Sequence, residues 1–504
     1  MTTRISPGAP APSPPAPAEG SPGMPHRLVL PTVLAGVFIT TLDFFIVNVA
    51  LPSLQTDLGA GASAVEWVVA GFGLAYGVGL ITGGRLGDLY GRRRMFLLGL
   101  GLFTVASLLC GVAQSGGSLV FARVLQGLAA ALIAPQVLAL LSTVFTGAAR
   151  VKAFAGYGLA MGLAAVFGQL IGGLLIEADV AGWGWRSCFL VNLPVCLLIM
   201  GLTLKVVPES KAGGRPGLDV VGVVVVTLAL VALVLPLIEG REEGWPLWTW
   251  LSFGAFAVLM AVFVAMERSI GRRGGSPLVN IPMFGDRAFV VGLACQLVFW
   301  MGQASFFLVL ALYLQAGRGL SALEAGLLFA ALGAGYLYTS MNATGFAARL
   351  GRQVLAVGAL LMVVGLVVIG VTAGRLGTGG HTAWLVPGLV IDGAGMGLVV
   401  APLASTVLAR VNPRYAGSAS GVLTTGLQIG NSIGVAVIGV IFYGALGDRP
   451  DASSFTHAFD RGIVFLCGVA AVLALLVQAL PRTNAVPRAR PAPAVVSDAE
   501  DDAG

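Results

Sequence analysis

The sequence predicts an all-α integral membrane protein with fourteen spanning helices, arranged as two six-helix bundles plus two inserted helices. Hydrophobic residues make up 57% of the 504 positions and charged residues only 10%, whereas a soluble domain carries about 25% charged residues. The apolar residues form runs of about twenty, the length that an α-helix needs to cross a bilayer. A soluble enzyme, a nucleic-acid-binding protein and a disordered scaffold are therefore excluded, because a soluble fold cannot hide so much apolar surface.

Fourteen apolar runs follow one another along the chain, and each is expected to form one membrane helix. Their approximate bounds are 28–52, 64–84, 94–113, 118–141, 153–176, 187–207, 217–238, 247–266, 288–314, 322–342, 353–373, 383–408, 417–444 and 461–480. An even number of crossings places both termini on the same side of the membrane.

The basic residues indicate which side that is. Of the 29 Lys and Arg residues, 22 fall in the tails and in one set of alternate loops, six fall on the opposite side, and Arg123 lies inside a run. Loops rich in Lys and Arg stay in the cytoplasm. Both termini are therefore expected to be cytoplasmic, with the chain in the cell membrane (the inner or plasma membrane).

The composition divides the chain into five parts. The first and last are rich in Pro, Ala and charged or small residues and cannot bury enough apolar area to fold. Glycines spaced four apart recur in runs 153–176 and 417–444. General helix packing explains them, and their matching positions in the two halves favour paired bundles that rock against each other. The expected parts are a disordered cytoplasmic tail (1–27), a six-helix bundle (28–207), a two-helix insert with cytoplasmic linkers (208–287), a second six-helix bundle (288–480) and a disordered cytoplasmic tail (481–504).

No cofactor or metal is expected. Most of the five cysteines lie inside apolar runs without a CxxC pair, and the three histidines lie near predicted loops, so neither a zinc site nor a disulfide framework is indicated. A phosphate-binding loop of the form GxxxxGK[ST] is missing from the sequence. The energy source is then an ion gradient, since one charge crossing 100 mV supplies about 2.3 kcal/mol, and catalysis as an enzyme is not expected.

Three ionisable residues lie deep inside apolar runs. Asp43 is about 15 residues into the first run, or about 22 Å along a helix, where an acid costs about 2.5–3.5 kcal/mol. Since a helix satisfies its own backbone, this cost indicates a function, and the group is suited to exchanging protons. Arg123 needs a partner when buried, and Asp43 is one candidate. Asp392 lies near the middle of run 383–408 and is a candidate second proton site or cation site. Structural ion pairs or hydrogen bonds are the alternatives for all three.

The loop between the second and third runs reads GGRLGDLYGRRRMF and combines glycines with charged residues. Gly84 and Gly91 permit tight turns, and Asp88 lies four residues before Arg92. Arg92 and Arg93 can also contact helix carbonyls or lipid phosphates. The residues alone indicate a basic loop that fixes topology and contacts membrane lipids.

A polar and aromatic stripe in run 288–314 indicates a cavity wall. Its members recur at spacings of four, three and four, so they share a helical face, and such a face suits a water-filled cavity better than lipid. Aromatic walls suit flat, apolar or cationic ligands, although interhelical hydrogen bonds explain the polar members equally well. The candidate cavity residues are Phe44, Asn48, Gln126, Gln169, Gln296, Trp300, Gln303, Phe307, Gln428 and Asn431.

Several motifs together resemble the fourteen-span drug:proton antiporters of the major facilitator superfamily, over about residues 28–480. LDFFIVNVALP resembles the first-helix signature, GGRLGDLYGRRRMF the loop motif, and RVLQG, beginning at Arg123, the fourth-helix motif. Trp185-Arg186 and Asn192-Leu193-Pro194 resemble the entry to the sixth helix. Two departures stand out: Gln169 follows Gly168 where the antiporter motif has Gly-Pro, and the second-half copy of the loop motif, GFAARLGRQ, lacks the acid.

The resemblance implies a bacterial carrier that works by alternating access and is functional as a monomer. In that scheme Asp43 carries the proton, Arg123 tunes it or relays the proton, and Asp88 with Arg92 latches the inward-closed state. Trp300 and its neighbours would contact the cargo. The implied function is proton-coupled export of lipophilic, often cationic, drugs or an antibiotic, with small molecules, protons and lipids as partners and no nucleic acid.

Two alternatives remain at this point. A carrier of the same superfamily could move a lipid, siderophore or nutrient, and a membrane protein with the same helices could act as a receptor or scaffold without transport. A measurement of transport would distinguish the carrier from the receptor or scaffold. The sequence does not identify the cargo.

Overall fold

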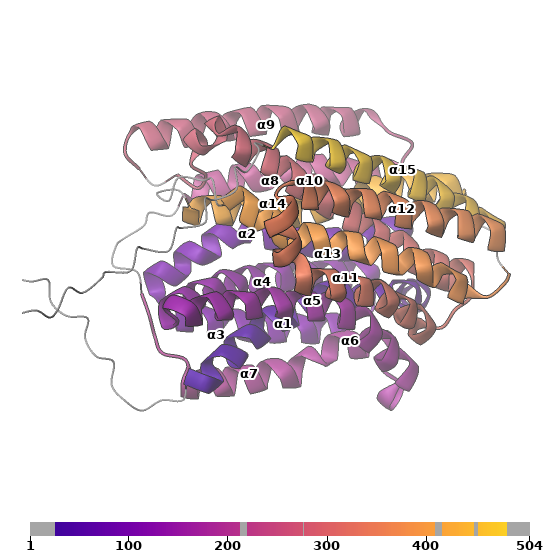
Figure 1. Ribbon diagram of the computed structural model, residues 1–504, viewed down its shortest axis with the longest axis horizontal. Coiled ribbons are helices and arrows are strands. Elements are labelled where there is room, and N and C mark those ends of the chain that lie inside the picture. The colour runs from indigo at the N-terminus through magenta and orange to yellow at the C-terminus, as the bar shows by residue number, and fades with distance from the viewer. Residues whose placement is uncertain are drawn as a thin grey trace, which may run out of the picture.

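The computed structural model describes residues 26–211, 219–275, 277–377, 379–408, 416–447 and 452–480, and Figure 1 shows them as a bundle of long helices. Within these residues no strand occurs, and fourteen helices are long and apolar enough to cross a membrane. The predicted all-α fold class and the predicted number of spans are thereby confirmed. The predicted tails 1–27 and 481–504 lie outside the described residues, except for His26 and Arg27 at the beginning of the first helix.

The first half of the chain forms six spans, the last of which is interrupted. Apolar composition drives each helix into the membrane, and Ser115 caps the fourth helix by accepting the Ser118 backbone N–H. Gly91, at φ 110°, makes the tight turn between the second and third helices. The elements are α1 (His26–Leu58), α2 (Ala62–Tyr90), α3 (Arg92–Gly111), α4 (Gly116–Val144), α5 (Gly147–Ala178), η1 (Val180–Gly182), η2 (Gly184–Arg186), α6 (Ser187–Leu190) and α7 (Asn192–Val206).

Several observed helices extend beyond the predicted runs, and two of the differences have local reasons. The sixth span breaks between α6 and α7 at Val191, because Pro194 lacks the N–H that would bond the carbonyl oxygen of Leu190. The last span begins at Ala452 rather than at 461. Its first turns carry polar and charged residues, which lowered the hydropathy on which the prediction depended.

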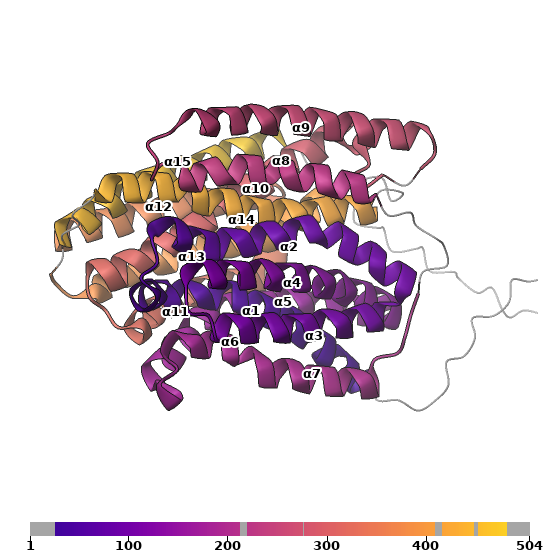
Figure 2. The same cartoon turned by 180° about the vertical axis from the view of Figure 1, so that it is seen from behind.

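The inserted pair consists of α8 (Val220–Glu239) and α9 (Leu247–Arg272). Helix α8 packs against both α2 and α14, whereas α9 packs mainly on α8. Figures 1 and 2 show α9 at the edge of the bundle. Only 11% of its most apolar stretch is buried by protein, so this helix presents most of its surface to the surroundings.

The second half repeats the six-span pattern. Helix α10 continues into one π-helical turn, and short 3-10 turns precede α10 and α13. The elements are η3 (Ile281–Gly285), α10 (Arg287–Leu312), η4 (Tyr313–Gly317), α11 (Ala322–Leu350), α12 (Gln353–Leu376), η5 (Thr382–Leu385), α13 (Val386–Leu408), α14 (Ala416–Leu446) and α15 (Ala452–Ala479).

The two halves meet along two seams, α2 with α14 and α5 with α11. Small residues let the helices approach: a Cβ added at Gly73 would meet Ser432 at 2.7 Å, and one added at Gly326 would meet the Gln169 carbonyl at 2.8 Å. Across the central helices, Gln315 Nε2 donates to the Val49 carbonyl at 3.0 Å. These contacts lie between the middle of the bundle and the end opposite the termini, so the halves are closed against each other there.

Candidate functional site

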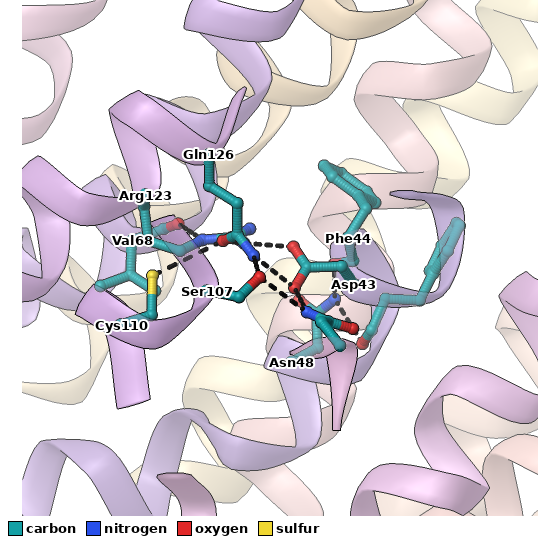
Figure 3. A network of polar contacts seen from close by, with 10 residues as sticks. Asp43, Phe44, Asn48, Val68, Ser107, Cys110, Arg123 and Gln126 are labelled. Atoms are coloured by element: carbon teal, nitrogen blue, oxygen red, sulfur yellow. Dashed lines mark hydrogen bonds and ion pairs between the residues drawn. The ribbon is translucent and has the colours of Figure 1, made fainter. Parts of the chain in front are cut away.

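Asp43 and Arg123 form a fully buried ion pair in the middle of the first half. The carboxylate comes from α1 and the guanidinium from α4, Nη1 lies 2.5 Å from Oδ2, and both side chains are 0% exposed. Figure 3 shows the two side chains pointing toward each other between their helices. Asp43, the candidate partner that the sequence offers for Arg123, is therefore its partner in the structure.

Amides complete the surroundings of the carboxylate. Gln126 Nε2 on α4 and Asn192 Nδ2 on α7 both donate to Asp43 Oδ1, at 2.8 and 2.7 Å. The same two amides also donate to Ser107 Oγ on α3, at 2.8 and 3.2 Å. The carboxylate therefore accepts three hydrogen bonds, and the cluster joins α1, α3, α4 and α7 within one half.

Arg123 is held from its other sides as well. Its Nε donates to the Val68 carbonyl of α2 at 3.0 Å, and its Nη1 also donates to Gln126 Oε1 at 2.6 Å. Its guanidinium carbon lies 4.1 Å from the centroid of the Phe72 ring, which provides a cation–π contact. Its Nη2 has no hydrogen-bond partner among the described residues.

This arrangement suits a reversible proton site. A buried pair is stable only while both charges are present, because removing one partner leaves an uncompensated charge that costs about 3–5 kcal/mol. A proton added to Asp43 removes the negative charge and leaves Arg123 with neutral acceptors alone. The ion pair thus connects the charge of this carboxylate to the packing of α1 against α4.

Sequence reasoning missed two members of the cluster. Ser107 lies in an apolar run without any other signal. Asn192 was noted only as part of a motif, although a lone amide directly before Leu193-Pro194 inside an apolar helix is itself a signal for a buried hydrogen bond. Gln126, predicted as a cavity residue, lies in this cluster and is 0% exposed.

A second buried acid lies in the core of the other half. Asp392 on α13 and Gln303 on α10 are 1% and 2% exposed and line one small cavity, together with apolar side chains of α12 and α15. Asp392 Oδ1 and Gln303 Oε1 have no hydrogen-bond partner among the described residues. The cavity offers about 10 Å³, room for about one water molecule. It therefore suits water or a proton and not a drug-sized ligand.

The two acids occupy related places in the two halves. Asp43 lies on the first helix of its half and faces the fourth, whereas Asp392 lies on the fourth helix of its half and faces the first. The first half supplies a buried cation, Arg123, whereas the cavity at Asp392 is lined by apolar residues and one amide.

The predicted stripe on α10 contacts different neighbours at different heights. Gln303 faces Asp392, whereas Phe307 stacks on Phe329 of α11 at 5.4 Å and contacts Phe45 of α1 at 5.1 Å, ring centroid to ring centroid. Trp300 is half-buried and contacts Phe299. The stripe therefore does not line a single cavity in this state. Phe307, at its C-terminal end, packs with Phe45 and Phe329 and so forms an aromatic junction between the two halves.

Phe44 and Asn48 extend this region along α1. Phe44 contacts Phe45 and Phe72, and Asn48 Nδ2 donates to the Phe44 and Phe45 carbonyls of its own helix, at 3.4 and 3.2 Å. Neither side chain contacts Asp43 through a hydrogen bond of its own among the described residues.

Three of the four remaining predicted cavity residues lie at or near the two seams. Asn431 Nδ2 donates to Gln428 Oε1 at 3.4 Å, and Gln428 packs against Gly77 of α2. Gln169 is fully buried on α5, and neither polar atom of its side chain has a hydrogen-bond partner among the described residues. Gln296 on α10 is 8% exposed.

The charged loop contacts the linkers on both sides of the inserted helix pair, and Arg85 Nη2 donates to the Pro277 carbonyl at 3.1 Å. Arg92 Nη2 lies 3.1 Å from Asp88 Oδ1, and the Arg92 backbone N–H donates to the Ser210 carbonyl at 2.9 Å. The Arg93 backbone N–H donates to Glu209 Oε1 at 3.2 Å, and its guanidinium donates to the Leu204 carbonyl at 3.0 Å.

Glycines shape the same loop. Gly91 turns the chain, and a Cβ at Gly84 would meet Pro135 of α4 at 3.5 Å. Asp88 and Arg92 are thus in contact with each other, and the backbone of Arg92 is held by the linker that follows α7.

Comparison with known proteins places these observations in a family. A family model described as Major Facilitator Superfamily matches residues 33–435 and 292–497. A probable actinorhodin transporter of Streptomyces coelicolor is 40% identical over 445 residues, covering 88% of this chain and 77% of that protein. A puromycin resistance protein of Streptomyces alboniger is 35% identical and covers 90% of each chain.

Two further similarities agree with this. A tetracenomycin C resistance and export protein of Streptomyces glaucescens is 31% identical over 86% of this chain and 78% of its own length. The crystal structure of a D-xylose–proton symporter superposes with a TM-score of 0.65 at 16% identity, covering 91% of this chain and 99% of that one. At this identity the structural similarity concerns the fold.

Proposed function

We propose that this chain, which belongs to the Major Facilitator Superfamily, exports lipophilic antibiotics or drugs in exchange for protons. The direction and the cargo class are supported by relatives that are named as an antibiotic transporter, a resistance protein and an export protein. The observation that carries the proton coupling is the buried Asp43–Arg123 pair, because an acid in the middle of a membrane helix has no structural necessity.

The proposed coupling runs through Asp43. In the state described, the ionised carboxylate holds Arg123 and the amides of Gln126 and Asn192. Cargo binds from the cytoplasm, and the carrier then turns outward. In the outward-facing state a proton arriving from outside neutralises Asp43 and weakens its hold on Arg123, which releases the cargo and resets the carrier to face inward. Release of the proton to the cytoplasm then restores the pair.

The proposed cargo site lies between the halves, at the aromatic junction. Phe45, Phe307 and Phe329 come from α1, α10 and α11 and pack together where the halves meet. Ring faces and edges of this kind favour flat, apolar molecules, and a positive charge on the cargo would gain from the ring faces as well. Trp300 would extend the same wall on α10.

The proposed orientation places both termini in the cytoplasm of a bacterial cell, with the chain acting as a monomer in the cell membrane. The seams described above then close the outer side, and the state is inward-facing. In the reverse state Asp88 and Arg92 would latch the cytoplasmic side. Asp392 is proposed as a second proton site, because its cavity has room for about one water molecule.

Everted membrane vesicles test the coupling. After respiration acidifies the vesicle interior, addition of ethidium is expected to release protons from vesicles that contain the native protein. Asp43→Asn is expected to abolish this release, and Asp57→Asn, an exposed acid near the outer end of the same helix, is expected to preserve it. Proton release by the Asp43→Asn variant at the native rate would remove Asp43 from the proposed role.

A further inference from the structure

A third buried acid lies at the closed end of the bundle and belongs to neither proton site. Glu66 is about one turn inside the beginning of α2 and is 0% exposed. The only cation paired with it among the described residues is Arg241, whose Nη2 lies 3.5 Å from Oε1. Neither carboxylate oxygen has a hydrogen bond within the described part of the chain. Glu66 is therefore held by charge alone.

Arg241 also contacts the other half of the molecule. It lies on the loop that joins the inserted helices α8 and α9, and its guanidinium carbon is 5.0 Å from the ring centroid of Tyr443 on α14. The carboxylate of Glu66 itself lies against Gly439 of α14, where an added Cβ would overlap it. One residue of the insert thus joins the first half to the second at their seam.

The rest of the inserted pair fastens this loop in place. Trp67 Nε1 donates to Glu239 Oε1 at 2.7 Å, and the backbone and hydroxyl of Ser63 donate to Glu242 at 3.1 and 3.2 Å. Further from this loop, Leu230 of α8 packs with Leu74 and Val78 of α2 and with Ile429 of α14 in one small apolar cluster. The insert therefore covers the α2–α14 seam and brings Arg241 to its outer end, where Arg241 Nη2 lies 3.5 Å from Glu66 Oε1 and 3.6 Å from Glu242 Oε1 of its own loop.

We propose that Arg241 and Glu66 form the outer gate of this transporter, and that the inserted helix pair carries the residue that closes it. The proposal rests on the alternating access proposed above. In the closed state Glu66 is buried, so its charge requires Arg241. When α2 and α14 separate, water reaches Glu66, and the carboxylate no longer depends on that partner. Arg241 thus stabilises the closed state selectively.

This electrostatic argument predicts an asymmetry between variants. Arg241→Gln leaves a buried, unpaired carboxylate in the closed state, so the outer side should open more often. Glu66→Gln removes the buried charge and should leave the gate closed. The double variant contains neither charge and should also close. Loss of the Arg241 packing on Tyr443 alone would not be reversed by a change at Glu66.

Cysteine labelling from outside measures the opening. Ser432 on α14 is 1% exposed and donates to the Ala70 carbonyl of α2 at 3.1 Å, so Ser432→Cys reports on the same seam. Cys467 is replaced by Ala, since the other four cysteines are buried, and a chain without the Ser432→Cys change gives the background. Spheroplasts are exposed to a membrane-impermeant maleimide.

Arg241→Gln is expected to raise the outer labelling rate at least tenfold, and the Glu66→Gln/Arg241→Gln double variant is expected to return within about threefold of the parent. Arg186→Gln is the matched control, because Arg186 pairs at 2.6 Å with Asp57 of its own half at the same end of the bundle. Labelling of the Arg241→Gln variant at the parent rate, or labelling of the double variant as fast as that of Arg241→Gln, would overturn the proposal.

Two further measurements keep the result interpretable. If Arg241→Gln does not fold, Glu66→Gln alone decides, because a tenfold increase in its labelling contradicts the argument. Proton release by ethidium is measured on the same parent chain. If the parent chain transports ethidium and Arg241→Gln is labelled at the parent rate, the gate is refuted and the proposed function stands. If the parent chain does not transport ethidium but Arg241→Gln is still labelled faster, the proposed function is refuted and the Arg241–Glu66 closure is supported.

Discussion

Removal of the buried guanidinium is the sharpest perturbation of the Asp43 cluster. In Arg123→Gln the carboxylate keeps the amide bonds from Gln126 and Asn192 but loses its only ion pair among the described residues, the 2.5 Å contact from Nη1. Since both partners are 0% exposed, water cannot replace the lost charge. Breaking a buried pair in this way costs about 3–5 kcal/mol in free energy of unfolding.

The double variant separates charge from packing. In Asp43→Asn/Arg123→Gln no buried charge is left in the cluster, and the new side-chain amide at position 43 can still bond the neighbouring amides. We expect most of the lost stability to return, so the coupling energy of the cycle should be at least about 2 kcal/mol, within the range of residues in direct contact. Arg92→Gln is the control, because its partly exposed pair with Asp88 is worth about 0–1 kcal/mol.

Reversible unfolding in mixed detergent micelles, followed by tryptophan fluorescence, measures these differences. The deficit of Arg123→Gln should shrink as the pH falls, because a proton neutralises the unpaired carboxylate. A deficit below about 1 kcal/mol at neutral pH, or one that is equally large at acid and neutral pH, would refute the argument that charge holds this cluster together.

Four other changes test separate parts of the account. Asn192→Ala removes one hydrogen bond to the carboxylate and should lower the free energy of unfolding by about 1.5–3 kcal/mol in the same micelle assay; an unchanged value would exclude that bond. Asp392→Asn should reduce the number of protons released per ethidium in everted vesicles while ethidium transport persists; an unchanged ratio would make Asp392 structural. Phe307→Ala should raise the KM for ethidium about tenfold with little change in kcat. A lower kcat with an unchanged KM would indicate that Phe307 acts in the conformational step and not in cargo binding. Asp88→Asn should slow transport with less than about 1 kcal/mol of lost stability, and a native transport rate would argue against the latch.

The sequence was most informative where the membrane imposes a simple rule. Apolar runs of bilayer length predicted fourteen spans, and the structure has fourteen helices that satisfy the same criteria within its described residues. A lone Asp43 and a lone Arg123 inside such runs also made Asp43 a candidate partner of Arg123, because each charge needs a partner in a low dielectric, and the two side chains do pair. Where polar residues lie at the end of a helix, as before Asp460 in α15, hydropathy underestimated the helix length.

The polar residues were harder to place, because a linear pattern does not say which neighbour a helix face meets. Gln303 and Phe307 share one face of α10, yet the first faces Asp392 and the second faces α1. Glu66 and Arg241 lie far apart in the sequence, and Glu66 stands near the end of a run, where acids are common. Their contact depends on how the insert packs on the α2–α14 seam, which periodicity does not reveal.

The account depends most on Asp43 changing its protonation state during transport. Infrared difference spectroscopy on the purified carrier, native minus Asp43→Asn, isolates the carboxylic acid band of this residue across a pH series, with and without ethidium. We predict a band that grows as the pH falls and whose midpoint shifts when ethidium binds. A carboxylate that stays ionised from mildly acid to alkaline pH, with ethidium bound or absent, would contradict the central claim.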